Sequence, residues 1–426
     1  MLLELELKNF ARKVAFIAAA LGVCSLLMAV IISRFVVGTL SDNRLGVSRG
    51  MLAAPLEYFP NSARLNARYA EAEMAETDRD LDRAEFHALR AINLSPNDYR
   101  FRLILSAVRE AKGDRVAAEE ALKAALALAP NDRDVHWRLA NVMLREGKLV
   151  ASLDEFRVAA AANPALLPGT LDLIWRASRG NFEAVETVAG ADPKSRLALA
   201  QFLVSKSRMA EASNVFRSVD RPARLAAAET AAVLTSLINA GQADLARELW
   251  AGLVAEGDAQ PQLIWNGGFE ADLLKNFPQF DWTFGRSEYA RLSFDGGHAR
   301  TGARSLRVDF LGRDTTKLDG EIKQLVVLRP GARYRLECYA KSEGLVTPEG
   351  PRVVVTDNAS NWVAASEPVA AGSNDWKLLA VEFVAPRYNT VSASPVLVSV
   401  KRKPKFSYDE PTQGTIWFDD FTIKEQ

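Results

Sequence analysis

A repeat of 34 residues is the feature of this 426-residue chain that most constrains its fold. Pro96-Asn97-Asp98 and Pro130-Asn131-Asp132 lie 34 residues apart, Pro164 follows after another 34, and Pro60-Asn61-Ser62 precedes by 36. Proline lacks the N–H that a further helical turn needs, and the Asn or Asp behind it can cap the next helix. The period therefore predicts helix-turn-helix units that must stack to bury their apolar faces.

The second helix of each predicted unit carries small residues on either side of a large one. Ala118, Leu122 and Ala125 stand at i, i+4 and i+7, which places them on one helical face where small side chains allow close helix approach. The same spacing recurs later in the chain, with the closing proline lost in the last two cases. The later sets are Ser152, Phe156 and Ala159, then Ala212, Phe216 and Val219, then Ala246, Trp250 and Leu253.

The small-large-small pattern and the closing Pro130 resemble the tetratricopeptide repeat family, with the best match over residues 60–164. This resemblance implies about five or six helical pairs over residues 51–257, stacked into a solenoid whose concave face holds a protein partner. A plain spacer between the membrane and the C-terminal domain is the alternative. The charged residues Arg100, Arg102, Arg109 and Glu110 are interpreted as a solvated face.

The N-terminal segment predicts a membrane anchor. Residues 14–32 contain Ser25 as their only clearly polar residue, and a helix of this length rises ~28 Å, close to the hydrocarbon thickness of a bilayer. We expect a single span at 14–37 in the inner (cytoplasmic) membrane and a linker at 38–50. Residues 1–13 should be cytoplasmic and the later domains extracytoplasmic, because Lys8, Arg12 and Lys13 precede the span.

After Gly257 the alanine-rich helical pattern gives way to alternating segments, so residues 262–426 are predicted to form a β-domain. Tyr334, Leu336, Cys338 and Ala340 share one face of a strand whose other face carries mostly charge. Many such short segments with turns between them indicate an antiparallel sandwich. The expected strands are 289–294, 306–310, 321–328, 332–341, 351–356, 376–384, 391–401 and 415–424.

The two ends of this β-domain resemble the first and last strands of jelly-roll carbohydrate-binding modules of the galactose-binding-like class. The motifs are Asn266-Gly267-Gly268-Phe269-Glu270 and Ile416-Trp417-Phe418-Asp419-Asp420-Phe421. The resemblance implies a structural calcium with Glu270 and Asp420 as ligands, since carboxylates supply the hard oxygens that calcium needs. Both could equally be hydrogen-bonded carboxylates at strand ends.

Polysaccharide binding on the β-domain would need exposed aromatic rings that stack on sugar faces. Trp362 and Tyr339 are the first candidates, with Tyr388 and Tyr408 as further ones. Four other tryptophans lie at strand starts or within strands and are interpreted as core residues. They are Trp265, Trp282, Trp376 and Trp417.

Composition and motifs argue against catalysis and against nucleic-acid binding. The chain has 53 basic and 53 acidic residues, so no overall charge favours nucleic acid. It lacks a nucleophile elbow, a zinc-protease motif and a phosphate-binding glycine loop. We therefore expect no enzyme activity and no cofactor beyond the calcium named above.

The combination of anchor, repeats and sandwich resembles bacterial cell-envelope proteins associated with exopolysaccharide production or export. This resemblance implies a membrane-anchored scaffold or accessory protein that binds a protein through its helices and a glycan through its sandwich. One alternative is a glycan receptor in which the helices form a stalk. Another is a glycoside hydrolase, whose paired carboxylates come from distant strands and leave no local motif.

Overall fold

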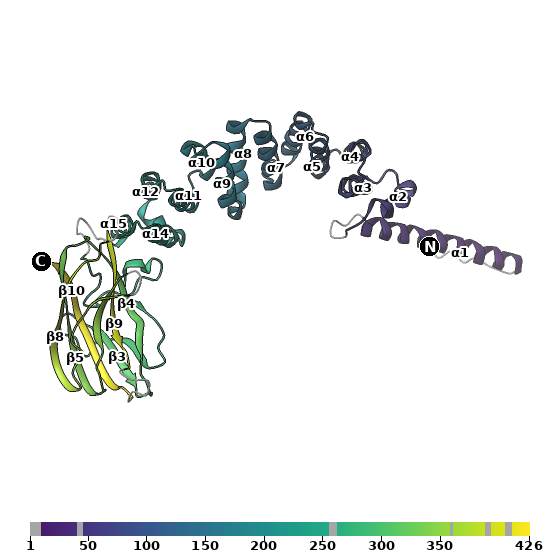
Figure 1. Cartoon of the computed structure of the whole chain (residues 1–426). Coiled ribbons are helices and arrows are strands. Elements are labelled where there is room, and N and C mark those ends of the chain that lie inside the picture. The colour runs from purple at the N-terminus through teal and green to yellow at the C-terminus, as the bar shows by residue number, and fades with distance from the viewer. Residues whose placement is uncertain (1–9, 41–45, 255–261, 358–360, 388–392, 405–410) are drawn as a thin grey trace. The chain divides into compact units, whose positions relative to one another are not determined.

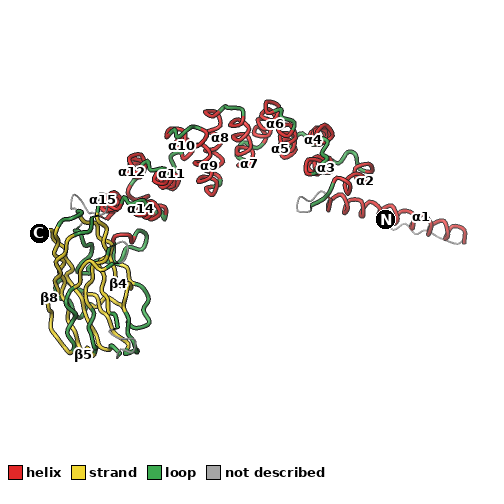
Figure 2. The backbone as a smooth tube through the Cα atoms, viewed as in Figure 1, coloured by secondary structure: helices red, strands yellow, loops and turns green. Residues whose placement is uncertain are grey.

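The computed structural model describes residues 10–40, 46–254, 262–357, 361–387, 393–404 and 411–426 (Figure 1). The chain divides into two compact units, Met1–Val188 and Ala189–Gln426, each treated by itself below. Helices fill the first unit and the beginning of the second, and strands follow (Figure 2). The predicted fold class is confirmed: an apolar N-terminal helix, a helical-repeat array and an antiparallel β-sandwich.

The first unit begins with an apolar helix and continues as helical pairs. Figure 1 shows the first helices of the pairs (α3, α5, α7) on one side of the array and the second helices (α4, α6, α8) on the other. The elements are α1 (Phe10–Leu40), α2 (Arg49–Tyr58), α3 (Ala63–Ala75), α4 (Leu81–Leu94), α5 (Tyr99–Ala111), α6 (Arg115–Leu128), α7 (Arg133–Arg145), α8 (Leu149–Ala162), the 3₁₀ turn η1 (Pro164–Leu166), α9 (Leu167–Ala177) and α10 (Phe182–Ala189), which ends at the unit boundary.

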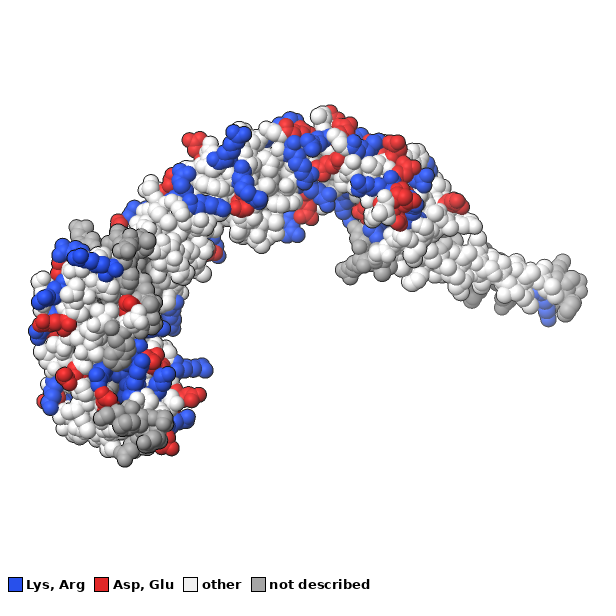
Figure 3. Space-filling model, in the orientation of Figure 1, with Lys and Arg blue, Asp and Glu red and all other residues white. Residues whose placement is uncertain are grey.

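Helix α1 has apolar side chains on all its sides. Its segment Lys13–Leu40 is, within the described residues, the one helix long and apolar enough by length and composition to cross a membrane. The side chains of Leu26, Ile31 and Phe35 are all more than half exposed. Figure 3 shows almost no charged atoms along α1, whereas basic and acidic atoms intermingle over the following helical pairs.

The predicted turns and packing faces hold the pairs together. The carboxylates of Asp98 and Asp132 accept backbone N–H groups at the starts of α5 and α7, as helix caps do. The three residues of every small-large-small set are buried, including the last, Ala246, Trp250 and Leu253. The 34-residue period therefore marks real helical pairs, and the spacing remains correct after the prolines are lost.

A side-chain to backbone hydrogen bond also recurs in the repeats, although different residue types make it. In five helices a side chain near the helix start donates a hydrogen bond to the carbonyl oxygen six residues earlier, which ties the helix to its preceding turn. The donor and acceptor pairs are Asn66 to Pro60, Arg102 to Pro96, His136 to Pro130, Arg196 to Gly190, and Thr230 to Arg224.

The second unit contains the remaining helices and two five-stranded antiparallel sheets, ordered β1-β4-β9-β6-β7 and β2-β3-β10-β5-β8. The helices are α11 (Pro193–Ser205), α12 (Met209–Ser218), α13 (Arg221–Ala226), α14 (Glu229–Asn239), α15 (Ala243–Val254) and the 3₁₀ turn η2 (Pro278–Phe280). The strands are β1 (Thr283–Phe284), β2 (Ala290–Asp295), β3 (Ser305–Leu311), β4 (Leu318–Leu328), β5 (Arg333–Val346), β6 (Arg352–Thr356), β7 (Trp362–Ala365), β8 (Gly372–Val384), β9 (Ser394–Arg402) and β10 (Gln413–Glu425).

The apolar faces of the two sheets meet in one core, as the alternation predicts. Tyr334, Leu336, Cys338 and Ala340 of β5 all belong to it. The short strands β1 and β7 were not predicted, because two to four residues are too few to show an alternation. Trp282 is in this core, but Trp417 faces the other way and is buried on the outer side of its sheet.

The start of the β-region and its last strand meet at a very close backbone approach. The N–H of Phe421 in β10 donates to the carbonyl oxygen of Gly267. A Cβ atom on Gly267 would lie 2.0 Å from the carbonyl oxygen of Phe421, whereas one on Gly268 would have no neighbour closer than 3.7 Å. Gly267 is therefore required by this contact, and Gly268 is not.

An aromatic joint connects the last helices to the sandwich within the second unit. The Trp250 side chain in α15 is fully buried, and its indole N–H donates to the Phe277 carbonyl oxygen at 2.9 Å. Its ring lies edge-on to Trp265 and Phe280, with centroid distances of 5.4 and 5.7 Å. The Arg247 guanidinium lies 4.6 Å from the Trp250 ring centre, and burial lowers the pKa of Arg247 to about 10.

Candidate functional site

A groove of about 760 Å³ lies across the first helices of three successive pairs in the first unit. Stacking of the repeats places residues that are distant in sequence on one surface. Examples at equivalent positions of successive repeats are Arg68, Ile104 and Arg138. Charged and apolar side chains follow one another at helical spacing on the lining faces of α3 and α5. The groove therefore has an apolar floor between basic groups. Its lining is Gly38, Arg64, Ala67, Arg68, Glu71, Met74, Arg100, Phe101, Leu103, Ile104, Ala107 and Arg138.

The groove is strongly basic. Four arginines line it against one acidic residue, Glu71, which forms an ion pair with Arg68 at 2.7 Å. Arg100 binds the cap residue Asp98 and lowers the pKa of that carboxyl group, so Asp98 stays ionised at neutral pH. The exposed side chains of Arg64 and Arg138 have no hydrogen bond or ion pair to any residue that the structure describes.

Two unpaired guanidinium groups beside an apolar floor can bind carboxylates and an aliphatic side chain together. Arginine presents a planar fork of donors that matches a carboxylate. Leu103, Ile104 and Ala107 supply apolar contact area between the charged groups. The Arg100 side chain is 62% exposed, in agreement with its interpretation as part of a solvated face. The groove that it lines was not predicted, because it forms only when the helical pairs stack.

Glu270 and Asp420, the predicted calcium ligands, are both held by donors of the protein itself. Glu270 accepts the backbone N–H groups of Ala303 and Arg304. Asp420 accepts the guanidinium of Arg300 at 2.6 Å and the hydroxyl of Thr301 at 2.5 Å. Both are hydrogen-bonded carboxylates, although Glu270 lies in the loop before β1 and Asp420 lies within β10, so neither stands at a strand end.

A calcium ion does not fit these carboxylates as they are arranged. The guanidinium of Arg300 already supplies positive charge to Asp420, and a cation there would have to displace it. Burial raises the pKa of the neighbouring Asp419, against the opposing effect of the N–H groups of Arg300 and Asp420. Within the described residues, no three His, Cys, Asp or Glu side chains gather as a metal site.

The predicted sugar-stacking residues are only partly open. Tyr339 lies on the outer face of β5, and the guanidinium of Arg300 covers its ring at 3.4 Å from the centroid. Trp362 begins β7, but its side chain lies outside the described part of the chain, as do Tyr388 and Tyr408. No described aromatic side chain of the sandwich is fully exposed.

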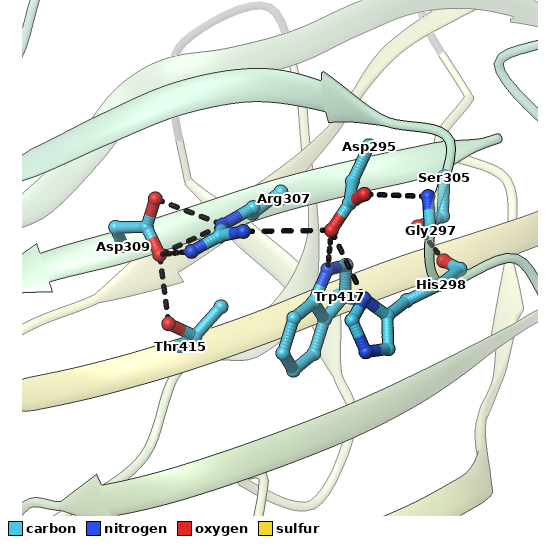
Figure 4. Close-up of polar contacts among 8 residues, drawn as sticks. All are labelled: Asp295, Gly297, His298, Ser305, Arg307, Asp309, Thr415 and Trp417. Carbon is cyan, nitrogen blue, oxygen red and sulfur yellow. Dashed lines mark hydrogen bonds and ion pairs between the residues drawn. The ribbon is translucent and has the colours of Figure 1, made fainter.

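A polar network covers Trp417 on the outer face of β2, β3 and β10 (Figure 4). The Asp295 carboxylate accepts the indole N–H of Trp417 at 2.7 Å and the backbone N–H of Gly297 at 2.7 Å. The His298 ring stacks on Trp417 at 4.4 Å, and its Nδ1 lies 3.2 Å from the same carboxylate. Arg307 lies over the indole as well. Trp417 is thus unavailable to a sugar ring.

This network predicts an acid-sensitive contribution to stability. Burial opposes ionisation of Asp295, but the N–H groups of Gly297 and Trp417 and the nearby His298 outweigh it and lower the pKa to about 2. Because the folded pKa lies below the unfolded value of ~3.9, the stabilisation is complete above about pH 4 and is lost as pH falls toward 2.

Asp295→Asn should therefore destabilise the second unit at pH 7 by about 1 kcal/mol, after allowance for solvent screening. The difference from wild type should shrink below about pH 4. Urea unfolding of the full chain in detergent, followed by tryptophan fluorescence from pH 7 to pH 3, measures it. Asp272→Asn, at a carboxylate that is 91% exposed, is the matched control, and an equal loss in both variants would contradict the prediction.

No family model matches this sequence, and no curated protein matches it. The solved structures with a partial likeness include one described as a CBM4 structure, 21% identical over 38% of this chain and 99% of that one, with a TM-score of 0.27. YrrB, described as a TPR protein with an unusual peptide-binding site, is 15% identical over 46% and 88% of the two chains, with a TM-score of 0.26. The Stig cyclase Fisc from Fischerella sp. TAU is 18% identical over 38% and 96%, with a TM-score of 0.27.

Proposed function

We propose that this chain is a non-catalytic scaffold, anchored in a membrane by α1, that holds a partner protein in the groove on α3, α5 and α7. The observation that carries the proposal is the pair of unpaired arginines, Arg64 and Arg138, at the two ends of an apolar floor. Buried ion pairs and apolar contacts at one site give both charge selectivity and affinity.

The anchor and its orientation belong to the same proposal. Its support is the helix of 28 residues, Lys13–Leu40, whose apolar side chains are exposed. Exposure of so large an apolar surface to water is unfavourable, whereas exposure to lipid is not. Lys13 precedes the apolar stretch, which favours a cytoplasmic N-terminus and extracytoplasmic repeats and sandwich in the inner membrane. A place beside exopolysaccharide production or export is proposed from the resemblance of the whole architecture.

Charge reversal in the groove tests the scaffold proposal. Arg100→Glu with Arg138→Glu should weaken partner binding on the order of 100-fold, because favourable charge pairs become repulsive. The measurement is quantitative co-purification of membrane proteins with the tagged full chain, followed by titration of the recovered partner. The control is Arg83→Glu with Arg157→Glu, which makes the same charge change on second helices, α4 and α8. Equal capture by both double variants would refute a groove-bound partner.

Glycan binding by the sandwich is a second candidate function, carried by one observation. Trp376 and Leu378 stand on the outer face of β8, and Tyr339 pairs directly with Leu378 in the neighbouring strand. Because Arg300 covers the Tyr339 ring, Trp376 and Leu378 provide the apolar surface beside it on which a sugar ring could stack.

We expect Tyr339→Ala with Trp376→Ala to abolish any binding of the full chain on a glycan array. Tyr58→Ala, which removes an aromatic side chain that is 80% exposed in the first unit, should leave it intact. Retained glycan binding by the double variant would exclude this patch as the binding site.

A further inference from the structure

The end of helix α1 forms part of the groove edge. Gly38, two residues before the end of α1, lies in the lining of the groove. Val37 and Leu40 pack against the buried cluster that includes Leu52 and Leu65. These contacts fix the last turn of α1 to the first repeats, so the groove and the apolar helix are parts of one packed structure.

The groove edge therefore lies close to the bilayer in which α1 is proposed to sit. Phe35, 72% exposed, is the last apolar side chain of α1 that is more than half exposed, and Arg34 is the first charged residue after Lys13. From Arg34 to Gly38 a helix rises only ~6 Å. A groove at that height opens at the level of the lipid headgroups and the first few residues that emerge from any neighbouring membrane protein.

We propose that the groove binds an acidic juxtamembrane segment of another protein held in the same membrane. This inference rests on the proposed scaffold function and names the class of its partner. The acidity follows from Arg64 and Arg138, the two arginines of the groove that remain unpaired after Arg68 binds Glu71 and Arg100 binds Asp98. An apolar side chain in the segment follows from the floor of Leu103, Ile104 and Ala107.

A protein segment fits the groove better than a lipid headgroup does. The volume of about 760 Å³ is large enough for several residues of an extended chain, and its floor is apolar between the arginines. A phospholipid keeps its acyl chains in the bilayer, so its headgroup would satisfy the arginines and leave Leu103 and Ile104 without an apolar partner. Both the charge and the apolar floor are used only by a peptide.

The position of the groove also predicts how tightly the segment binds. A segment tethered to the same bilayer by a short linker is held near the groove at an effective concentration in the millimolar range. Weak intrinsic affinity then suffices for full occupancy on the membrane, and the same peptide free in solution should bind far less.

The test uses the full chain in phosphatidylcholine vesicles with a fluorescent eight-residue probe of aspartates and glutamates around one leucine. The probe is supplied free, joined to a membrane-spanning helix by a two-residue linker, or joined by a 30-residue linker. We expect the short-linked probe to bind about 10- to 100-fold better than the free probe, with the long-linked probe between them. Arg100→Glu with Arg138→Glu should abolish the binding of all three, and a lysine-rich probe should not bind.

Three results would overturn the inference. Equal binding of the free and short-linked probes would refute a partner segment held next to the membrane. The groove would still bind a peptide, so the scaffold proposal would not be refuted. Binding of the long-linked probe alone would show that the groove faces away from the bilayer. The third result is displacement of the probe by phosphatidylglycerol vesicles, together with enrichment of that lipid around wild type but not around the arginine double variant. It would show that a lipid headgroup occupies the groove.

Discussion

Gly267→Ala should destabilise the second unit by about 3 kcal/mol, whereas Gly268→Ala should have little effect. A Cβ atom at position 267 would stand 2.0 Å from the carbonyl oxygen of Phe421, so the backbone must move and the hydrogen bond from Phe421 to Gly267 must lengthen. At position 268 the nearest atoms are 3.7 Å away, an ordinary contact. Neither glycine has a positive φ, so the left-handed backbone region is not the reason for the difference.

Thermal and urea unfolding of the full chain in detergent, followed by near-ultraviolet circular dichroism, measures this difference. The paired variants add the same methyl group one residue apart, so general effects of alanine on the unfolded chain are closely matched. Similar midpoints for the two variants would mean that the start of the β-region does not pack on β10 as described.

Trp250→Ala should be the most damaging substitution in the helical part of the second unit, at about 3–5 kcal/mol. The fully buried indole fills the joint between α15 and the segment that leads into the sandwich, and its N–H satisfies the Phe277 carbonyl oxygen. The substitution leaves a cavity and an unpaired acceptor, and it removes the ring beneath Arg247.

The loss should also separate the unfolding of the helices from that of the sandwich. Limited proteolysis of the full chain at increasing urea should cut α13–α15 before the strands in Trp250→Ala, but together with them in wild type. Trp376→Ala, at a half-buried tryptophan on the edge strand β8, is the control and should keep a single transition. A single transition in Trp250→Ala would show that the joint does not couple the two parts.

Local patterns were sufficient to predict the first helical pairs and the longer strands of this fold, but not the short strands β1 and β7. The 34-residue period located the helical pairs because proline, cap and small-large-small face recur within one short unit. The alternation in residues such as Leu306 and Val308 located the longer strands. These signals lie within ten or so residues of one another, which is the range over which helix and strand periodicity acts.

The contacts between elements could not be predicted in the same way. Arg300 reaches Asp420 from a hairpin 120 residues earlier, and no local pattern distinguishes it from other surface arginines. The groove combines Arg64, Arg100 and Arg138 from three different repeats. An alignment of the repeats by position would have revealed part of it, since Arg68, Ile104 and Arg138 are equivalent, whereas the contribution of Gly38 from α1 depends on tertiary packing.

The hydrogen bond from each helix start to the carbonyl oxygen six residues earlier is made by asparagine, arginine, histidine and threonine in different repeats. These side chains share a hydrogen-bond donor that reaches the same carbonyl position, so the contact depends on geometry and is made by chemically unlike residues. The repeats can therefore differ in residue type at this position and still keep the hydrogen bond that holds each turn to its helix. The ring of His136 contacts acceptors at both nitrogens, the Glu155 carboxylate at Nδ1 and the Pro130 carbonyl oxygen at Nε2, so this side chain also links α7 to α8.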